Sequence, residues 1–232
     1  MNKTIALLEN IKDVKVVDSF IDYSDYVAID LSESNEELSK LNITDALAFE
    51  NYIENYLSKN NAKVAFGGYQ EIRNLYKRST VFNDNASEER NIHIGLDLWI
   101  KAGTNVLAAL DGEIHSFQNN TALGDYGPTI LLQHQLEDFA FYTLYGHLSL
   151  ESLNDKKIGT SVKKGEVIAT LGSPPINGDY APHLHFQIII DIENKTGDYP
   201  GVCSKKDLNF YADNCPDPNL LLKIVKHYKS GI

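Results

Sequence analysis

Length, composition and charge exclude several classes of protein. The chain has 232 residues, of which 43% are hydrophobic, enough for one large domain or for a domain with a smaller appendage. Its 21 basic and 32 acidic residues give a formal charge of −11, which repels phosphate groups, so we expect no nucleic-acid partner. We find neither a membrane-length apolar stretch nor an export signal. We therefore expect no membrane insertion and a cytoplasmic location, or an extracytoplasmic one if a leader was removed or is non-standard.

The first 65 residues differ in composition and periodicity from the rest. They are rich in Asp, Glu, Asn and Ser, and their apolar residues recur at helical intervals, so we predict an α-rich N-terminal appendage over residues 1–65. Ser34 and Glu37 have the spacing of a capping box, in which two side chains satisfy free backbone N–H groups at a helix start. A helix is also predicted over residues 44–57, with the buried stripe Phe49, Ile53, Tyr56 and Leu57.

The apolar period changes from helical to alternating at residues 63–68. From there to Asp191, short β-branched or aromatic runs are separated by Gly, Asn and Pro, which is typical of an antiparallel sheet protein. We therefore predict a mainly β core domain over residues 66–192. Its expected strands cover residues 91–100, 112–118, 129–134, 139–145, 167–171 and 183–191.

Residues 193–232 form a third segment, which we expect to be a C-terminal extension packed on the core. The extension contains Pro216 and Pro218, followed by the apolar run Leu220-Leu221-Leu222-Lys223-Ile224-Val225. A terminal helix that packs this run against the sheet would account for the pattern.

The segment Asn91-Ile92-His93-Ile94-Gly95-Leu96-Asp97 places three candidate residues on one face of a strand. Because side chains alternate between faces, His93, Gly95 and Asp97 point one way and the apolar residues the other. In a straight strand, the Cα atoms of His93 and Asp97 would lie about 13 Å apart, which nearly exhausts the reach of both side chains. Gly95 lacks a Cβ and allows a bend with room for an ion, so we predict a kinked strand.

A second segment, Pro182-His183-Leu184-His185-Phe186, places two imidazoles on one face and two apolar side chains on the other. Together with His93 and Asp97, these imidazoles form a zinc-like ligand set. Because the two histidines are about 7 Å apart along a strand, both need not bind the metal, and one is free for proton transfer. His147 ends an apolar strand, a position from which functional side chains project.

These motifs occur in the order HxxxD, an isolated histidine in Tyr145-Gly146-His147-Leu148, and HxH. The order resembles that of the lysostaphin-type M23 zinc metallopeptidases, over about residues 90–191. The resemblance implies an antiparallel β core of the M23, duplicated-hybrid-motif-like kind. It further implies one Zn²⁺ ion with water in the fourth position, held by His93, Asp97 and His185. By the same resemblance, the catalytic residues are His147 and His183.

The resemblance implies a zinc-dependent metalloendopeptidase that hydrolyses peptide bonds with a metal-activated water, with peptidoglycan crosslinks among the expected substrates. Two alternatives stay open: a non-catalytic zinc-binding module, and an intracellular amidase or peptidase acting on a small amino-acid derivative. The second arises because flanking segments such as Gly67-Gly68-Tyr69 are similar to those of an M23-like module in some bacterial multidomain kinase and aminotransferase proteins. The expected partner is a peptide or peptidoglycan-like substrate, and the oligomeric state is left open.

We expect the remaining histidines and two tyrosines to stabilise the fold and to take no part in metal binding or catalysis. A single histidine on a strand is more often hydrogen-bonded than a metal ligand, so we expect structural roles for His115, His134 and His227. Tyr126 and Tyr145 are expected to pack, with donation to an oxyanion as the alternative.

Three arginines and one polar segment lie near the motifs. Arg73, Arg78 and Arg90 are expected in exposed ion pairs, and bidentate binding of a substrate carboxylate is the alternative. The segment Asn83-Asp84-Asn85 is near enough in sequence to occupy an open metal position, so a latent state is a further hypothesis.

Overall fold

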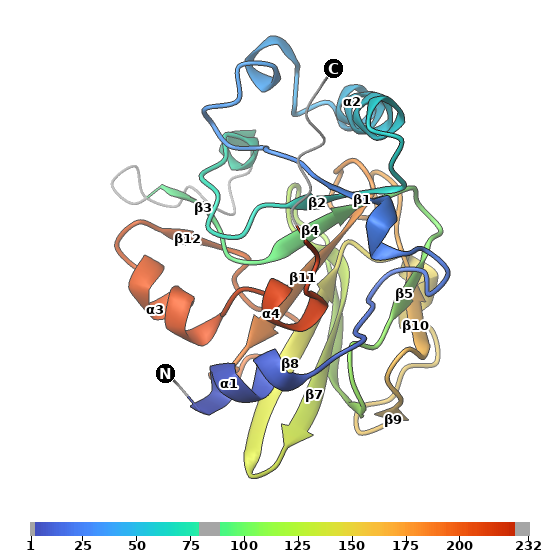
Figure 1. Cartoon of the computed structure of the whole chain (residues 1–232), viewed down its shortest axis with the longest axis vertical. Coiled ribbons are helices and arrows are strands. Elements are labelled where there is room, and N and C mark those ends of the chain that lie inside the picture. The colour runs from blue at the N-terminus through green and yellow to red at the C-terminus, as the bar shows by residue number, and fades with distance from the viewer. Residues whose placement is uncertain (1–2, 79–88, 226–232) are drawn as a thin grey trace.

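The chain folds around one eight-stranded sheet. The computed structural model describes residues 3–78 and 89–225 (Figure 1). In chain order, the strands of this sheet are β1 (Tyr26–Ala28), β2 (Val64–Gly67), β4 (Leu96–Trp99), β6 (Gly112–Asn120), β7 (Gly127–Leu136), β8 (Phe139–Gly146), β9 (Ser161–Val162) and β11 (His183–Ile189). They lie in the order β1-β2-β4-β11-β8-β7-β6-β9, and all neighbours except the parallel pair β1 and β2 are antiparallel.

Two shorter antiparallel pairs and four α-helices complete the described fold. The pairs are β5 (Asn105–Leu107) with β10 (Val167–Thr170), and β3 (Arg90–His93) with β12 (Val202–Ser204). The helices are α1 (Lys3–Asn10), α2 (Ala46–Lys59), α3 (Leu208–Asn214) and α4 (Asn219–Leu222). The predicted fold class, mainly β and antiparallel with a C-terminal helix, is confirmed.

Five of the six expected strands are present with ends shifted by only a few residues, and the sixth is divided. The strand expected over 91–100 is split into β3 and β4 by Ile94 and Gly95. The sequence analysis did not predict β1, β2, β5, β9 and β12, which have only two to four residues each. Such short strands carry too few alternations to be recognised from sequence.

Helix α2 confirms the helix expected over residues 44–57. The Asp45 carboxylate caps it by accepting hydrogen bonds from the backbone N–H groups of residues 47 and 48, both at 3.0 Å. The stripe packs as expected, with Phe49 and Ile53 buried. The capping box at Ser34 and Glu37 was wrong, because Glu37 precedes a single 3₁₀ turn and makes no side-chain cap there.

The N-terminal segment contributes to the main sheet and to its core. Strands β1 and β2 form one end of the sheet, and α2 lies beyond them (Figure 1). Residues from α1 and the segment after it share one apolar cluster with the central strands: Leu8, Val14, Val16, Val17, Leu98 and Phe186. The domain boundaries at residues 65 and 192 stay predictions.

Strand β11 runs through the middle of the sheet and divides its side chains between two environments. Leu184, Phe186 and Ile188 enter the largest apolar cluster, which also receives Leu221 and Leu222 from α4. His183, His185 and Gln187 therefore point to the opposite face. This alternation places both histidines of the HxH motif on the side of the sheet where the candidate site lies.

Candidate active site

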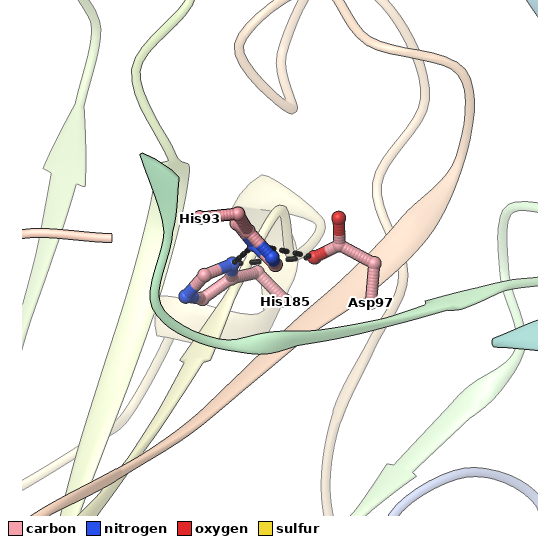
Figure 2. Close-up of side chains that lie close together, drawn as sticks. All are labelled: His93, Asp97 and His185. Carbon is pink, nitrogen blue, oxygen red and sulfur yellow. Dashed lines mark hydrogen bonds and ion pairs between the residues drawn. The ribbon is translucent and has the colours of Figure 1, made fainter. Parts of the chain in front are cut away.

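The first two site residues flank an interruption between two strands. β3 ends at His93 and pairs with β12, whereas β4 begins at Leu96 and pairs with β2 and β11. The chain turns between these strands, and Figure 2 shows the ribbon curving from His93 to Asp97. The predicted kink is confirmed, and it allows His93 and Asp97 to meet although they lie on different strands.

Gly95 is required by the close approach of a neighbouring ring. A Cβ atom at Gly95 would lie 2.4 Å from Cε1 and 2.5 Å from Nε2 of His185. The imidazole of His185 thus packs directly on the backbone at Gly95. The sequence analysis expected this glycine to make room for an ion, but the space that it leaves is filled by the ligand's own ring.

Three donor atoms from His93, Asp97 and His185 form a small buried triangle (Figure 2). Nε2 of His93 lies 2.9 Å from Nδ1 of His185, and Oδ1 of Asp97 lies 3.2 Å from each of these nitrogens. Zinc bonds of about 2.0–2.1 Å at tetrahedral angles separate neighbouring ligand atoms by roughly 3.3 Å. The edges of the triangle lie within a few tenths of an ångström of that separation, so the residues fit one zinc-sized ion.

Hydrogen bonds behind each imidazole direct its lone pair into the triangle. Nδ1–H of His93 donates to the carbonyl oxygen of Gly68, and Nε2–H of His185 donates to Oε1 of Gln187, both at 2.9 Å. The two remaining nitrogens are then acceptors that face each other, an arrangement that a shared cation stabilises. Burial lowers the pKa of His93 to about 4, so its imidazole is neutral at pH 7 and able to bind a metal.

Gln187 is a site residue that the sequence analysis missed. Its Nε2–H₂ group donates to the carbonyl oxygen of Pro200 at 3.1 Å and to Sγ of Cys215 at 3.2 Å, which turns Oε1 toward His185. It follows His185 by two residues, so the period of two that linked the histidines also indicates this position. The hydroxyl of Tyr126 lies 3.4 Å from Nε2 of His185. This tyrosine therefore contacts the nitrogen of His185 that is not part of the triangle.

Arg73 is buried beside Asp97, and the expectation of an exposed ion pair was wrong. Its side chain is 1% exposed, its Nη1 donates to Oδ2 of Asp97 at 2.5 Å, and its Nε donates to Oε2 of Glu71 at 2.6 Å. Burial by itself raises the pKa of Asp97, but His93 and Arg73 reverse this effect and hold the pKa well below its usual range. Asp97 is therefore a carboxylate with one oxygen in the triangle and the other on Arg73.

The two catalytic candidates lie side by side next to the triangle. Nδ1–H of His183 donates to the carbonyl oxygen of Ala181 at 2.8 Å, and its Nε2 lies 4.0 Å from Oδ1 of Asp97. His147 follows β8 in the left-handed region with φ of 62°, and its Nδ1–H donates to the carbonyl oxygen of Asn177 at 2.7 Å. Their ring centroids are 4.2 Å apart. Each ring thus leaves Nε2 as an acceptor.

Both catalytic candidates are neutral at pH 7. Burial lowers the pKa of His183 to about 4, and burial together with the neighbouring His183 lowers the pKa of His147 well below its ordinary value. A neutral imidazole with a free Nε2 can accept a proton.

Trp99 is a second residue that the sequence analysis missed. Its indole stacks on the imidazole of His183 with ring centroids 3.9 Å apart and planes inclined by 21°. Phe49 of α2 packs edge-on against the Trp99 indole, with ring centroids 5.2 Å apart. Helix α2 thereby supports the orientation of a catalytic candidate.

The triangle and both catalytic candidates line one cavity of about 420 Å³. Much of its wall is formed by residues 124–126, 194–196 and 198–202 and by Arg73, Leu75 and Tyr76. This volume falls in the range of pockets that hold small molecules or part of a peptide. Burial raises the pKa of the half-buried Asp125 and Asp198 in this wall.

His115, His134 and Tyr145 lie outside the lining of this cavity, in agreement with their structural interpretation. His134 contacts the hydroxyl of Thr143 through Nε2 at 2.7 Å and a backbone carbonyl through Nδ1. The Tyr145 hydroxyl accepts a hydrogen bond from the backbone N–H of Ala109 at 2.9 Å.

The other sequence hypotheses fall partly outside the described residues. His227, the segment 83–85 and the side chain of Arg78 belong to parts of the chain that the structure does not describe. Arg90 lines the cavity, and its guanidinium donates to the carbonyl oxygen of Val202 at 3.0 and 3.2 Å.

Sequence comparison identifies the part of the chain that carries this site. Residues 91–197 match the model of Peptidase family M23, a range that includes both ligand motifs and His147. This part of the chain is similar to the M23 peptidases. A curated relative from Haemophilus influenzae, described as an uncharacterized metalloprotease, is 35% identical over 99 residues. The match covers 43% of this chain and only 19% of that relative.

Solved structures with local similarity to this part of the chain include two peptidases. The catalytic domain of the antimicrobial peptidase lysostaphin from Staphylococcus simulans is 26% identical, with 66% of this chain and 95% of that chain covered and a TM-score of 0.40. A zinc-containing peptidase from Vibrio cholerae is 27% identical, with 42% and 27% covered and a TM-score of 0.32. The similarity to the family rests on the sequence match.

The range that matches the M23 family does not contain all the residues around the site. Phe49, Glu71 and Arg73 precede the matched range and still contact its site residues, directly or through one neighbour. Within residues 3–78 and 89–225, every helix is too short or too polar to cross a membrane.

Proposed function

We propose that the chain is a zinc-dependent peptidase that hydrolyses an amide bond. One observation carries the proposal: donor atoms of His93, Asp97 and His185 lie 2.9–3.2 Å apart in a cavity that also holds two further imidazoles. These three side chains would hold the ion. When bound, zinc would supply a Lewis acid that lowers the pKa of water to near 7 and polarises a carbonyl group.

His147 and His183 would move protons at Nε2. Because both imidazoles are neutral at pH 7, either Nε2 can accept a proton from the attacking water. Once protonated, the same atom can donate a hydrogen bond to the oxygen that gains negative charge, or return the proton to the leaving amine. The two rings lie in contact, so we assign both roles to the pair.

The substrate we propose is a peptide, and peptidoglycan crosslinks are one source of such bonds. A small amino-acid derivative is the second candidate, because a 420 Å³ cavity walled in part by residues 73–76 is large enough to enclose it. The non-catalytic alternative predicts metal binding without turnover of either class.

The test is a hydrolysis screen of the zinc-loaded protein against muropeptides, oligoglycine and dipeptides. We expect His147→Ala and His183→Ala to lower turnover by at least about 100-fold and to retain the zinc stoichiometry of the wild type. His185→Ala should lose zinc. His134→Ala is the matched control, because it removes a buried imidazole outside the cavity and should keep both properties.

Two results would contradict the proposal. Wild-type turnover in both His147→Ala and His183→Ala would remove these residues from the mechanism. Zinc binding by the wild type with no turnover in the whole screen would favour the non-catalytic module.

A further inference from the structure

The arginine beside the metal-ligand candidates connects two carboxylates in the interior. Arg73 contacts Asp97 through Nη1 and Glu71 through Nε, and both distances are those of short charge-assisted hydrogen bonds. Glu71 is itself held by the backbone N–H of Leu31, which donates to Oε1 at 3.0 Å. A continuous hydrogen-bond network therefore connects the backbone of Leu31 to Asp97 through Glu71 and Arg73.

In this hydrogen-bond network the two oxygens of Asp97 have different partners. Oδ2 accepts the hydrogen bond from Arg73, and Oδ1 lies 3.2 Å from the nitrogens of both histidines in the triangle. A carboxylate can bind a metal through one oxygen or through two. The guanidinium holds Oδ2, which leaves Oδ1 as the oxygen that faces an ion in the triangle.

Gly68 makes the placement of the guanidinium possible. A Cβ at this residue would lie 1.9 Å from Nη2 of Arg73, and its φ of 103° favours glycine as well. The carbonyl oxygen of Gly68 also accepts the hydrogen bond that orients His93. The same backbone residue thus helps to place two of the three ligand candidates.

We propose that Arg73 is a positioning residue that restricts Asp97 to one-oxygen coordination and so leaves the fourth position of the metal open. The inference rests on the metal site of the proposed function. Arg73 and Glu71 lie before residue 91, so residues outside the range matched to the M23 family supply part of the site. Arg73 acts through Asp97 and need not touch the substrate.

The test uses the full chain loaded with Co²⁺, whose visible absorption is intense in four-coordinate sites and weaker in five-coordinate ones. In Arg73→Met, Oδ2 of Asp97 is released and should join the ion, so the visible bands should lose intensity. This variant also leaves the buried Asp97 and the partly buried Glu71 without their cation, which endangers folding. The double variant Glu71→Gln with Arg73→Met removes one charge of each sign and keeps the net charge of the wild type.

Glu71→Gln alone is the matched control, because Arg73 remains on Asp97 and the four-coordinate spectrum should persist. A four-coordinate wild type and a five-coordinate double variant are the expected results. Identical four-coordinate spectra would overturn the role of Arg73 and leave the proposed function intact. Failure of the wild type to bind Co²⁺ or Zn²⁺ would instead overturn the metal site, and this inference with it.

Discussion

Replacement of Gly95 by alanine tests the close packing of a ligand ring on the backbone. The added Cβ would lie 2.4 Å from Cε1 of His185, and ordinary contact begins near 3.4 Å. The ring must therefore retreat by about 1 Å, whereas metal–ligand distances tolerate only about 0.2 Å. Gly95 has no positive φ, so the backbone itself accepts an alanine. The substitution should therefore act on the ligand more than on the fold.

The expected effect on zinc affinity is large. Loss of a partner that only orients a ligand costs about 10–100-fold in metal affinity. Because Gly95→Ala displaces His185 itself, we expect a loss of at least about 100-fold, which corresponds to roughly 2.7 kcal/mol. Overpacking should also reduce the free energy of unfolding by about 1–3 kcal/mol. Competition with a chromogenic chelator measures the affinity, and urea titration of the metal-free protein measures the stability.

Gly103→Ala provides the control for this experiment. Its φ is 78°, so alanine there is strained, but no atom lies within 4 Å of the added Cβ. We expect a modest loss of stability with unchanged zinc affinity. The reasoning would be refuted by a Gly95→Ala variant whose zinc affinity stays within about threefold of the wild type, since that result would mean that His185 does not depend on the missing side chain.

Two further predictions concern buried rings. His134 has a pKa lowered by burial from 6.5 to about 4, so the unfolded chain binds more protons between these values and stability should fall as the pH drops from 6.5 toward 4. This shift contributes about 3 kcal/mol to the free energy of unfolding above pH 6.5. In a pH series of urea titrations, the loss of stability in acid should therefore be smaller in His134→Gln than in the wild type by about that amount. Equal losses in the two proteins would contradict the assignment. Trp99 is the only tryptophan of the chain and stacks on His183, which should quench its emission. We expect His183→Gln to increase that emission, whereas unchanged fluorescence would contradict the stack.

The local elements of this fold were predictable because their sequence signals are strong. Strands β6, β7, β8, β10 and β11 and helix α2 each carry an apolar period that extends over at least four residues. The capping box failed because the same residue types also suit an isolated 3₁₀ turn, and only contacts with the rest of the chain select between the two. Strand β2 joins the sheet by pairing with β4, and β1 joins it by pairing with β2, so both depend on partners that are distant in sequence.

The candidate site was predictable to the extent that its residues share a strand or a motif. Alternation placed His93 with Asp97 and His183 with His185, and the resemblance divided them into ligands and catalytic residues. The structure brings the three ligand candidates into one triangle and places His147 beside His183. Gln187 could have been included on the same periodic argument.

The sequence by itself determined the fold class, the kink at Gly95 and the chemical groups of the site, because these follow from side-chain alternation and motif order. Only the tertiary structure decided which groups support them. Arg73 is 24 residues before Asp97, and no local pattern distinguishes a buried arginine from an exposed one. The stack of Trp99 on His183 likewise depends on the pairing of β4 with β11. Such contacts join segments far apart in the chain, and the packed fold alone sets their distances.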